Sequence, residues 1–242
     1  MGVQPKELQW AGHWCPFDMV DNIDEDCARR TDRANAGKPL RILIPVGGAG
    51  AQKKFIIKFV RALAPYVKED RVQLFLNAGD HSHMKTAFLQ VLDECGLDFE
   101  MVQTTEAVIA FQQRLLIAKN EPPKNVTLFA FDEYFPAVAT TDIICRVTDI
   151  LSCKPSELAF YCVPKLHIRR VGDHEAASAK RSSELGDGTL EARELEDAVA
   201  YLEMFLTSPD LLISMNQSIV SNNKIDIYHG CRRAVEIVTS NL

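Results

Sequence analysis

The stretch that decides the fold is residues 40–63, LRILIPVGGAGAQKKFIIKFVRAL. Residues 40–46 are apolar nearly throughout, which is typical of a parallel strand whose two faces are both covered. Pro45 suits the end of such a strand, because proline cannot donate to a neighbouring strand. Small residues follow as a loop, and the helix predicted after them has one apolar face. That face is formed by Phe55, Ile56, Phe59, Val60 and Leu63.

The same alternation of short apolar strands and amphipathic helices continues toward the C-terminus. Further strands are predicted at 72–76, 99–102, 126–131, 150–151 and 166–168. Strands that alternate with helices indicate an α/β fold with a parallel sheet. We therefore predict a Rossmann-like, doubly wound parallel sheet of about six strands, with helices on both faces and a helical C-terminal tail. The order 3-2-1-4-5-6 is the expected one for this class.

The two ends of the chain differ from the patterned region. Residues 1–38 contain both tryptophans, an acidic stretch and a basic run, with no sustained period of a helix or strand. We interpret 1–38 as a leader or linker without a core element, 39–220 as the Rossmann-like domain and 221–242 as a C-terminal helix. At 242 residues, the chain is expected to be about one domain long and short of a two-domain enzyme.

Composition argues against several classes of protein. The formal net charge is −6 and the pI is near 5.6, which disfavours a nucleic-acid partner. The sequence contains no run of about 18 apolar residues and no signal-peptide core at its start. Its seven cysteines include no Cys-x-x-Cys pair, which indicates reduced thiols. We expect a soluble, cytoplasmic protein.

In an open α/β sheet, ligands bind beyond the carboxyl ends of the strands, so the loops there are the candidate sites. The first is the glycine loop formed by Gly47, Gly48, Ala49 and Gly50. Its backbone N–H groups and the helix that follows favour a phosphate group. The loop lacks the spacing of a dinucleotide fingerprint and the lysine of a P-loop. A tight turn without a ligand is an equally good explanation of these residues alone.

Two later turns each place a glutamate near the start of a predicted helix. One contains Ser156 and Glu157, in a helix expected to begin near Pro155, and the other contains His174 and Glu175. The helix macrodipole explains a glutamate at such a position without any ligand, and on spacing alone this explanation is favoured.

The order of these features resembles the C-terminal, nucleotide-sugar-binding half of GT-B glycosyltransferases. The similarity covers roughly residues 41–188, and it is greatest to the family 28 group, which includes the peptidoglycan N-acetylglucosaminyltransferase and the plant galactolipid synthases. The resemblance implies that Glu157 holds the ribose hydroxyls. It also implies that His174 and Glu175 face the donor sugar.

The resemblance further implies a UDP-linked sugar as donor substrate, with no separate cofactor. Catalysis would need an acceptor-binding domain or partner subunit, through which the protein could associate with a membrane surface. The chain alone would then bind nucleotide and transfer nothing. The alternative function is a non-catalytic nucleotide- or metabolite-binding or interaction module with the same fold.

Two other residues are candidates for the cleft. His81 follows the second predicted strand, and Phe135 follows the fourth, where an aromatic ring could stack on a base. Packing against a neighbouring domain explains Phe135 equally well. The pair His81 and His83 lacks a third ligand by spacing, so no metal site is predicted. Glu184 and Asp187 flank a glycine turn and are not expected to act as a pair of catalytic acids.

Overall fold

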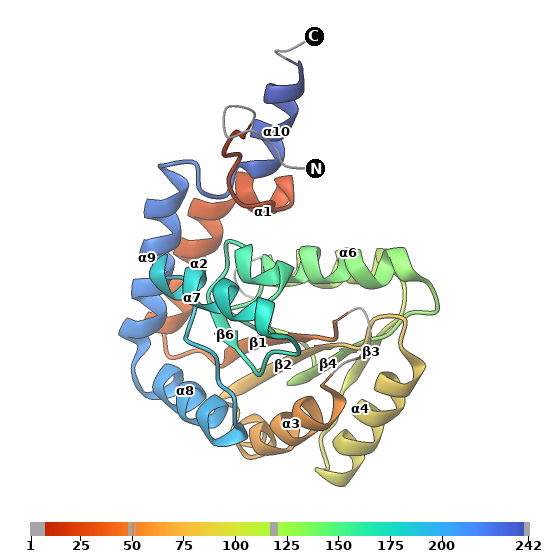
Figure 1. Cartoon of the computed structure of the whole chain (residues 1–242). Coiled ribbons are helices and arrows are strands. Elements are labelled where there is room, and N and C mark those ends of the chain that lie inside the picture. The colour runs from red at the N-terminus through yellow and green to blue at the C-terminus, as the bar shows by residue number, and fades with distance from the viewer. Residues whose placement is uncertain (1–7, 48–49, 51, 117–120, 240–242) are drawn as a thin grey trace.

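A computed structural model describes residues 8–47, 50, 52–116 and 121–239. In this described part, six parallel strands form one sheet between two layers of helices (Figure 1). The fold is therefore the predicted α/β, Rossmann-like class. The strands are β1 Leu40–Pro45, β2 Val72–Asn77, β3 Glu100–Val102, β4 Val126–Phe129, β5 Ile150–Cys153 and β6 Lys165–His167.

The strand order is β3-β4-β2-β1-β5-β6, so the predicted order is wrong. β4 lies between β3 and β2, and β5 takes the place beside β1 that was expected for β4. Burial explains the difference. β4 is fully buried, whereas Glu100 and Met101 of the three-residue β3 are only partly buried. A short, half-exposed strand is suited to a sheet edge. The other outer strand, β6, is fully buried, and isolated bridges join it to Gly188 and Ala192 on its outer side.

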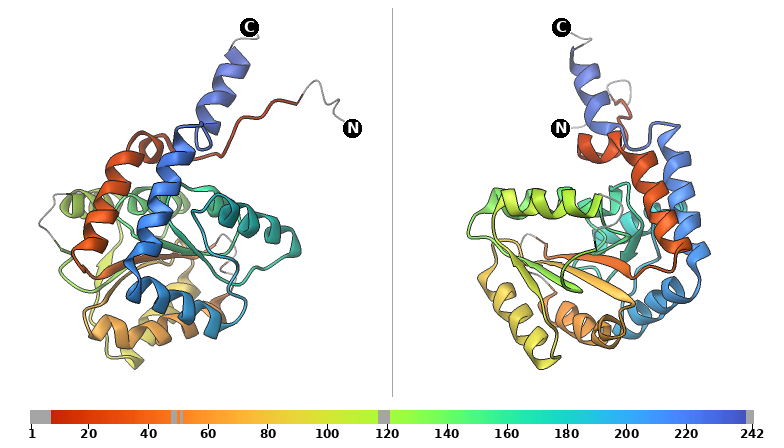
Figure 2. Two further views of the ribbon diagram at one scale, coloured as in Figure 1. Left: turned by 90° about the vertical axis from the view of Figure 1, so that its left-hand side faces the viewer. Right: turned by 180° about the vertical axis from the view of Figure 1, so that it is seen from behind.

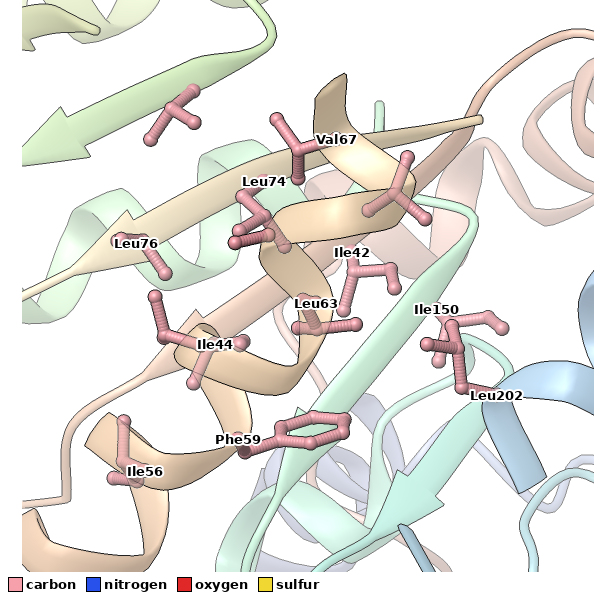
Figure 3. Close-up of a cluster of buried hydrophobic side chains, with 14 of the residues drawn as sticks. Ile42, Ile44, Ile56, Phe59, Leu63, Val67, Leu74, Leu76, Ile150 and Leu202 are labelled. Atoms are coloured by element: carbon pink, nitrogen blue, oxygen red, sulfur yellow. The ribbon is translucent and has the colours of Figure 1, made fainter. Parts of the chain in front are cut away.

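Alternate side chains of β1 enter two separate cores. Leu40, Ile42 and Ile44 pack in the first core (Figure 3). It is covered by α3 Lys53–Lys68, α4 Ser82–Glu94 and α8 Leu195–Thr207. Leu43 packs in the second core. The second core is covered by α1 Phe17–Asp21, α2 Ile23–Asn35, α5 Thr105–Leu116, α6 Tyr134–Cys145 and part of α9 Pro209–Asn223.

The segment 1–38 was expected to contain no core element, and this expectation is wrong. Within it, α2 lies alongside α9 (Figure 2) and buries Ile23 and Cys27. Arg30 is buried as well, and its guanidinium donates to the carbonyls of Thr148 (2.7 Å) and Cys145 (3.0 Å). A buried arginine within the apolar face hides the helical period from a hydrophobicity pattern, which is why the helix was missed.

The C-terminal region is helical, but its last helix is α10 Gly230–Thr239 rather than 221–242. This helix extends away from the sheet layers beside the N-terminal segment (Figures 1 and 2). Trp14 pairs with His229 through an isolated antiparallel bridge, which joins the two segments.

Among the described residues, no single helix is long and apolar enough to cross a membrane. The pair α8 and α9 satisfies the same criteria of length and composition only when taken together, and it bends by 92° at the break.

Candidate ligand-binding site

The strand order defines two positions at the carboxyl edge of the sheet where neighbouring connections diverge, and we call them the first and second crevice. After β1 the chain enters α3 on the first core, whereas after β5 it turns to the second core, where Cys162 and Val163 are buried. Likewise α4 and α6, which follow the neighbouring strands β2 and β4, cover opposite faces. Ligands of open α/β sheets bind where neighbouring connections diverge in this way.

At the first crevice, the loops after β1, β5 and β6 meet at Lys154. A Cβ on Gly47 would lie 3.2 Å from Lys154 Cε, so the lysine stem passes directly over this glycine. The ammonium group contacts Glu175 Oε1 at 2.5 Å. The other carboxylate oxygen, Oε2, accepts the Val171 N–H at 2.8 Å. Three loops are thereby joined beside the predicted phosphate loop.

The charge state of Glu175 is set by two opposing effects. The residue is buried, and burial by itself raises the pKa of a carboxyl group. Hydrogen bonds from Lys154 and from the Val171 N–H more than offset burial, so the pKa of Glu175 lies below its usual range. Glu175 is therefore an ionised partner that holds Lys154 in place.

The glycine loop and the helix after it are partly described. Gly48 and Ala49 lie outside the described residues. Gly50 has a left-handed φ of 59°, and a Cβ there would collide with the imidazole of His83. The loop then leads into α3, which begins with Lys53 and Lys54 and has no acidic residue in its first turn. Positive charge is thus gathered at the end of the helix that already carries the positive pole of the dipole.

The predicted helix near Pro155 is corrected by the structure. Only a four-residue 3₁₀ turn, Glu157–Phe160, follows Ser156 at this position. A single turn aligns few peptide dipoles, so the favourable field expected at Ser156 is largely absent. Ser156 is half-buried, and the side chain of Glu157 lies outside the described residues. Its assignment to a ribose remains a prediction.

The second predicted turn separates its two residues. Asp173–Glu175 is a 3₁₀ turn that leads into α7 Ala176–Glu184. Glu175 points toward Lys154, but His174 is exposed, and its ring lies over Gly172 in its own turn. The structure thus brings Glu175, but not His174, into contact with the residues around Gly47.

The second crevice contains His81 and a buried amide that the sequence analysis did not select. Asn77, at the end of β2, donates to Ala137 O and to Thr141 Oγ1, both at 3.0 Å, and fixes α6 against the strand end. His81 and His83 lie with their ring centroids 5.6 Å apart. Because His83 also contacts Gly50, the two histidines connect this crevice with the glycine loop.

Phe135 lies on the first turn of α6 and is 81 % exposed, and its neighbour Tyr134 is also exposed. Their rings pack edge to face, with centroids 5.7 Å apart. Within the described ranges, no group of three or more His, Cys, Asp or Glu side chains is placed to hold a metal ion. Lys154 is the main residue that sequence reasoning missed. Its signal was available, because it is the first basic residue after a buried strand.

These features define a Rossmann-like α/β protein with a basic, glycine-containing site at the carboxyl edge of its sheet. Residues 3–239 match the family described as a domain of unknown function, DUF6938, and the chain belongs to that family. No curated protein matches the chain by sequence.

Two solved structures have a related arrangement. One is the UDP-GlcNAc 2-epimerase from Neisseria meningitidis bound to UDP-GlcNAc, with 14 % identity and a TM-score of 0.48, covering 91 % of this chain and 52 % of the epimerase chain. The other is the glycosylation-associated protein Gap123 complex from Streptococcus agalactiae, with 11 % identity and a TM-score of 0.47. The match covers 86 % of this chain and 38 % of the chain in that complex. The chain therefore spans about half or less of these proteins.

Proposed function

We propose that this chain binds a nucleoside-diphosphate sugar, UDP-linked, and forms the donor half of a glycosyltransferase. The observation that carries the proposal is the contact of Lys154 with Gly47, in the loop that leads into α3. A diphosphate has the charge and size to contact the loop backbone, the helix end and the ammonium group together.

The electrostatics of the crevice support an anionic ligand. α3 contains 16 residues, so its aligned dipoles place a substantial positive pole at the glycine loop. Lys53 and Lys54 add positive charge at this pole instead of neutralising it. The like charges destabilise the helix end until an anion binds there. The charge of Lys154 is balanced by Glu175, so Lys154 contributes N–H donors in a fixed position, and the net positive charge comes from the helix end with Lys53 and Lys54.

The remaining contacts of the donor follow from the resemblance to the GT-B group. In this proposal Glu157 holds the ribose hydroxyls, while His174 and Glu175 face the sugar. The exposed ring of Phe135 stacks on the base, which is a favourable use of an aromatic side chain at a strand end. His81 lines the opposite wall, next to His83.

The chemical contribution of this half is stabilisation of the leaving group. During transfer, the bond between the anomeric carbon and the diphosphate oxygen breaks and a bond to the acceptor oxygen forms. The loop N–H groups and Lys154 neutralise the charge that develops on the departing diphosphate. A base on an acceptor-binding domain or partner subunit takes the acceptor proton. We assign the protein to the cytoplasm, where that partner could place it at a membrane surface.

A second candidate, a non-catalytic interaction module, is favoured by one surface. The N-terminal segment and the region of α10 expose an unusual number of large apolar side chains. They are Leu8, Trp10, Trp14, Phe17, Ile225, Val235 and Val238. Single exposed apolar residues are ordinary, but a group of this kind marks an interaction site. The surface suits the acceptor-binding partner of the first proposal equally well.

Calorimetric titration of the purified chain tests the donor proposal. UDP and UDP-sugars should bind saturably, and uridine, which lacks the phosphates, should bind much more weakly. Lys154→Ala should weaken the binding of UDP. Lys180→Ala, which removes an exposed lysine of α7, should leave UDP binding unchanged. Glu157→Ala should reduce the affinity that depends on the ribose.

Three results would contradict parts of this proposal. Absence of UDP binding removes the donor function and leaves the interaction module. Binding that is unchanged by Glu157→Ala removes the ribose assignment and favours a different nucleotide or metabolite. Sugar transfer by the chain alone shows that it needs no acceptor partner.

A further inference from the structure

A cavity of about 210 Å³ lies at the amino ends of the strands. It is bordered by Leu40 at the start of β1, by Asp70 and Arg71 before β2, and by Asp149 before β5. The proposed donor site begins after the other end of the six-residue β1, which is about 20 Å away at the rise of a strand. The cavity is therefore separate from that site.

One wall of the cavity is apolar and comes from the corner between α8 and α9. These helices meet at 92°, and their ends lie beside the end of α2 (Figure 2). Phe205 and Leu206 end the first helix, and Pro209 and Leu212 begin the second. Ala34 of α2 is the small residue among the apolar lining groups. This wall suits a hydrocarbon group rather than a polar one.

The buried charges that line the cavity already neutralise one another. Arg33 Nε lies 3.3 Å from both carboxylate oxygens of Asp149, and its Nη2 donates to Pro39 O at 2.6 Å. Asp149 also accepts the backbone N–H of Arg41 at 2.9 Å. These groups are satisfied by the protein, so they do not require a charged ligand.

The cations at the mouth differ from this buried pair. Lys38 and Arg71 have half-exposed side chains, and the ion pairs they form with Glu121 and Glu69 are long. Lys38 Nζ is 3.8 Å from Glu121, and Arg71 Nη1 is 3.6 Å from Glu69, both beyond hydrogen-bond length. Lys38 can therefore turn toward an anion at the mouth while the apolar part of the anion lies against α8 and α9. Arg71 can do so by leaving the ring of Tyr66, over which its guanidinium lies at 5.3 Å.

We propose that this cavity binds a small carboxylate with an apolar body, of about the size of phenylacetate. An apolar cavity of about 150 Å³ holds benzene in another protein. A volume of about 210 Å³ accommodates a ring with a short side chain. The ring contacts the wall formed by Phe205 and Leu212, and the carboxylate pairs with Lys38 and Arg71.

The test uses phenylacetate as the probe and 2-phenylethanol as its uncharged analogue. Binding is followed in ¹H–¹⁵N spectra of the full chain through the amide signals of Phe205 and Leu212. The double variant Lys38→Ala with Arg71→Ala removes the charges at the mouth. Its matched control, Lys180→Ala with Arg193→Ala, removes two exposed cations that do not line the cavity.

Two further variants fill the cavity from opposite sides, Ala34→Leu from α2 and Leu206→Trp from α8. Circular dichroism identifies which of the two variants fold, and one folded variant is sufficient for the binding test. UDP titration of the same proteins keeps this test separate from the donor proposal, because a failure at one edge of the sheet leaves the other unaffected.

We expect saturable binding of phenylacetate that is about tenfold weaker in the double variant, unchanged in the control and lost in a folded filling variant. Three results would overturn the proposal. One is equal affinity for 2-phenylethanol, another is unchanged affinity in a folded filling variant, and the third is the absence of saturation at millimolar phenylacetate.

Discussion

Lys165 and Asp187 form an ion pair of 2.9 Å in which both side chains are completely buried. Asp187 also accepts hydrogen bonds from Ser182 Oγ (2.7 Å) and Tyr228 OH (2.6 Å). Lys165 donates to two backbone carbonyls. The pair thus connects β6 with the turn after α7 and with the segment before α10. Asp187 is part of this structural network and not a surface acid.

Removing one member of this pair should destabilise the fold strongly. Asp187→Asn leaves the ammonium group of Lys165 buried without a counter-charge, and the free energy of unfolding should fall by about 3–5 kcal/mol. Tyr228→Phe removes the hydrogen bond to Asp187 and a longer one from Asn222 (3.4 Å), and it should cost about 1.5–3 kcal/mol because one acceptor is charged. Urea unfolding measures both changes. A loss below 1 kcal/mol for Asp187→Asn would show that the pair does not behave as a buried one.

A second prediction concerns His167, which is buried next to Lys165 and whose ring nitrogens have no partner in the described structure. Burial, with a smaller contribution from Lys165, lowers the pKa of His167 to about 3. The unfolded chain therefore binds a proton that the folded chain does not, between about pH 6.5 and pH 3. Stability should fall as the pH falls through this window.

At pH 5 this difference amounts to about 2 kcal/mol relative to neutral pH. His167→Leu removes the titrating group, so its unfolding free energy should depend less on pH between 7 and 5 than that of the wild-type chain. Urea unfolding at both pH values gives the comparison. Identical pH dependence in the two proteins would mean that the folded chain also protonates His167.

A third prediction concerns Lys154 and Glu175. Because the folded pKa of Glu175 is lowered, its contribution to stability is present at neutral pH and is lost as the pH falls through the folded pKa. Lys154→Met leaves the carboxylate buried and raises that pKa. The midpoint of acid unfolding, followed by circular dichroism, should move to higher pH in Lys154→Met and stay in place in Lys180→Ala. The same midpoint of acid unfolding in the wild-type chain, Lys154→Met and Lys180→Ala would contradict a stabilising ion pair between Lys154 and Glu175.

A fourth prediction separates two reasons for glycine at position 50. Gly50 and Gly37 have nearly equal left-handed φ angles, 59° and 60°, but a Cβ at Gly37 meets no atom within 4 Å. Gly37→Ala therefore measures the backbone strain alone, which is about 1–2 kcal/mol. Gly50→Ala should cost slightly more in urea unfolding, because the exposed imidazole of His83 must turn away from the added methyl group.

The part of the stability loss that comes from the contact with His83 should be recovered when the imidazole is removed. The double variant Gly50→Ala with His83→Ala should return to roughly the loss seen in Gly37→Ala, and it should bind UDP more tightly than Gly50→Ala. If removal of the imidazole recovers no stability, then His83 does not pack on the loop.

The apolar strands were predictable because the hydrophobic pattern reports burial directly. β1 and β2 lie within one residue of their predicted bounds, and Pro45 is the last residue of its strand. The strand order was not predictable in this way, since it depends on long-range pairing, such as that of β4 with both β2 and β3, which a local pattern does not contain. Likewise α2 was missed because Arg30 and Asp26 are buried by hydrogen bonds and ion pairs, which have no signature in a hydrophobicity pattern.

The candidate site was predictable to a similar degree. Gly47 and Glu175, both selected from the sequence, lie on either side of Lys154, because the carboxyl ends of parallel strands share an edge. Their roles toward a ligand stay predictions. The link between them, Lys154, depends on the direction of a long side chain and on the relative position of two loops. Neither is determined by local sequence, so the contacts of Lys154 with Gly47 and Glu175 became visible only in three dimensions.

The pairing of α2 with α9 has a consequence for synthesis. α2 leaves the ribosome long before α9, so the apolar face around Ile23 and Cys27 stays without its partner until the residues between the two helices have been made. Such a contact between distant parts of a chain forms late and slows folding. The sheet can assemble before α2 and α9 pack together. The chain should then pass through a state in which the sheet is formed and α2 is not yet packed against α9.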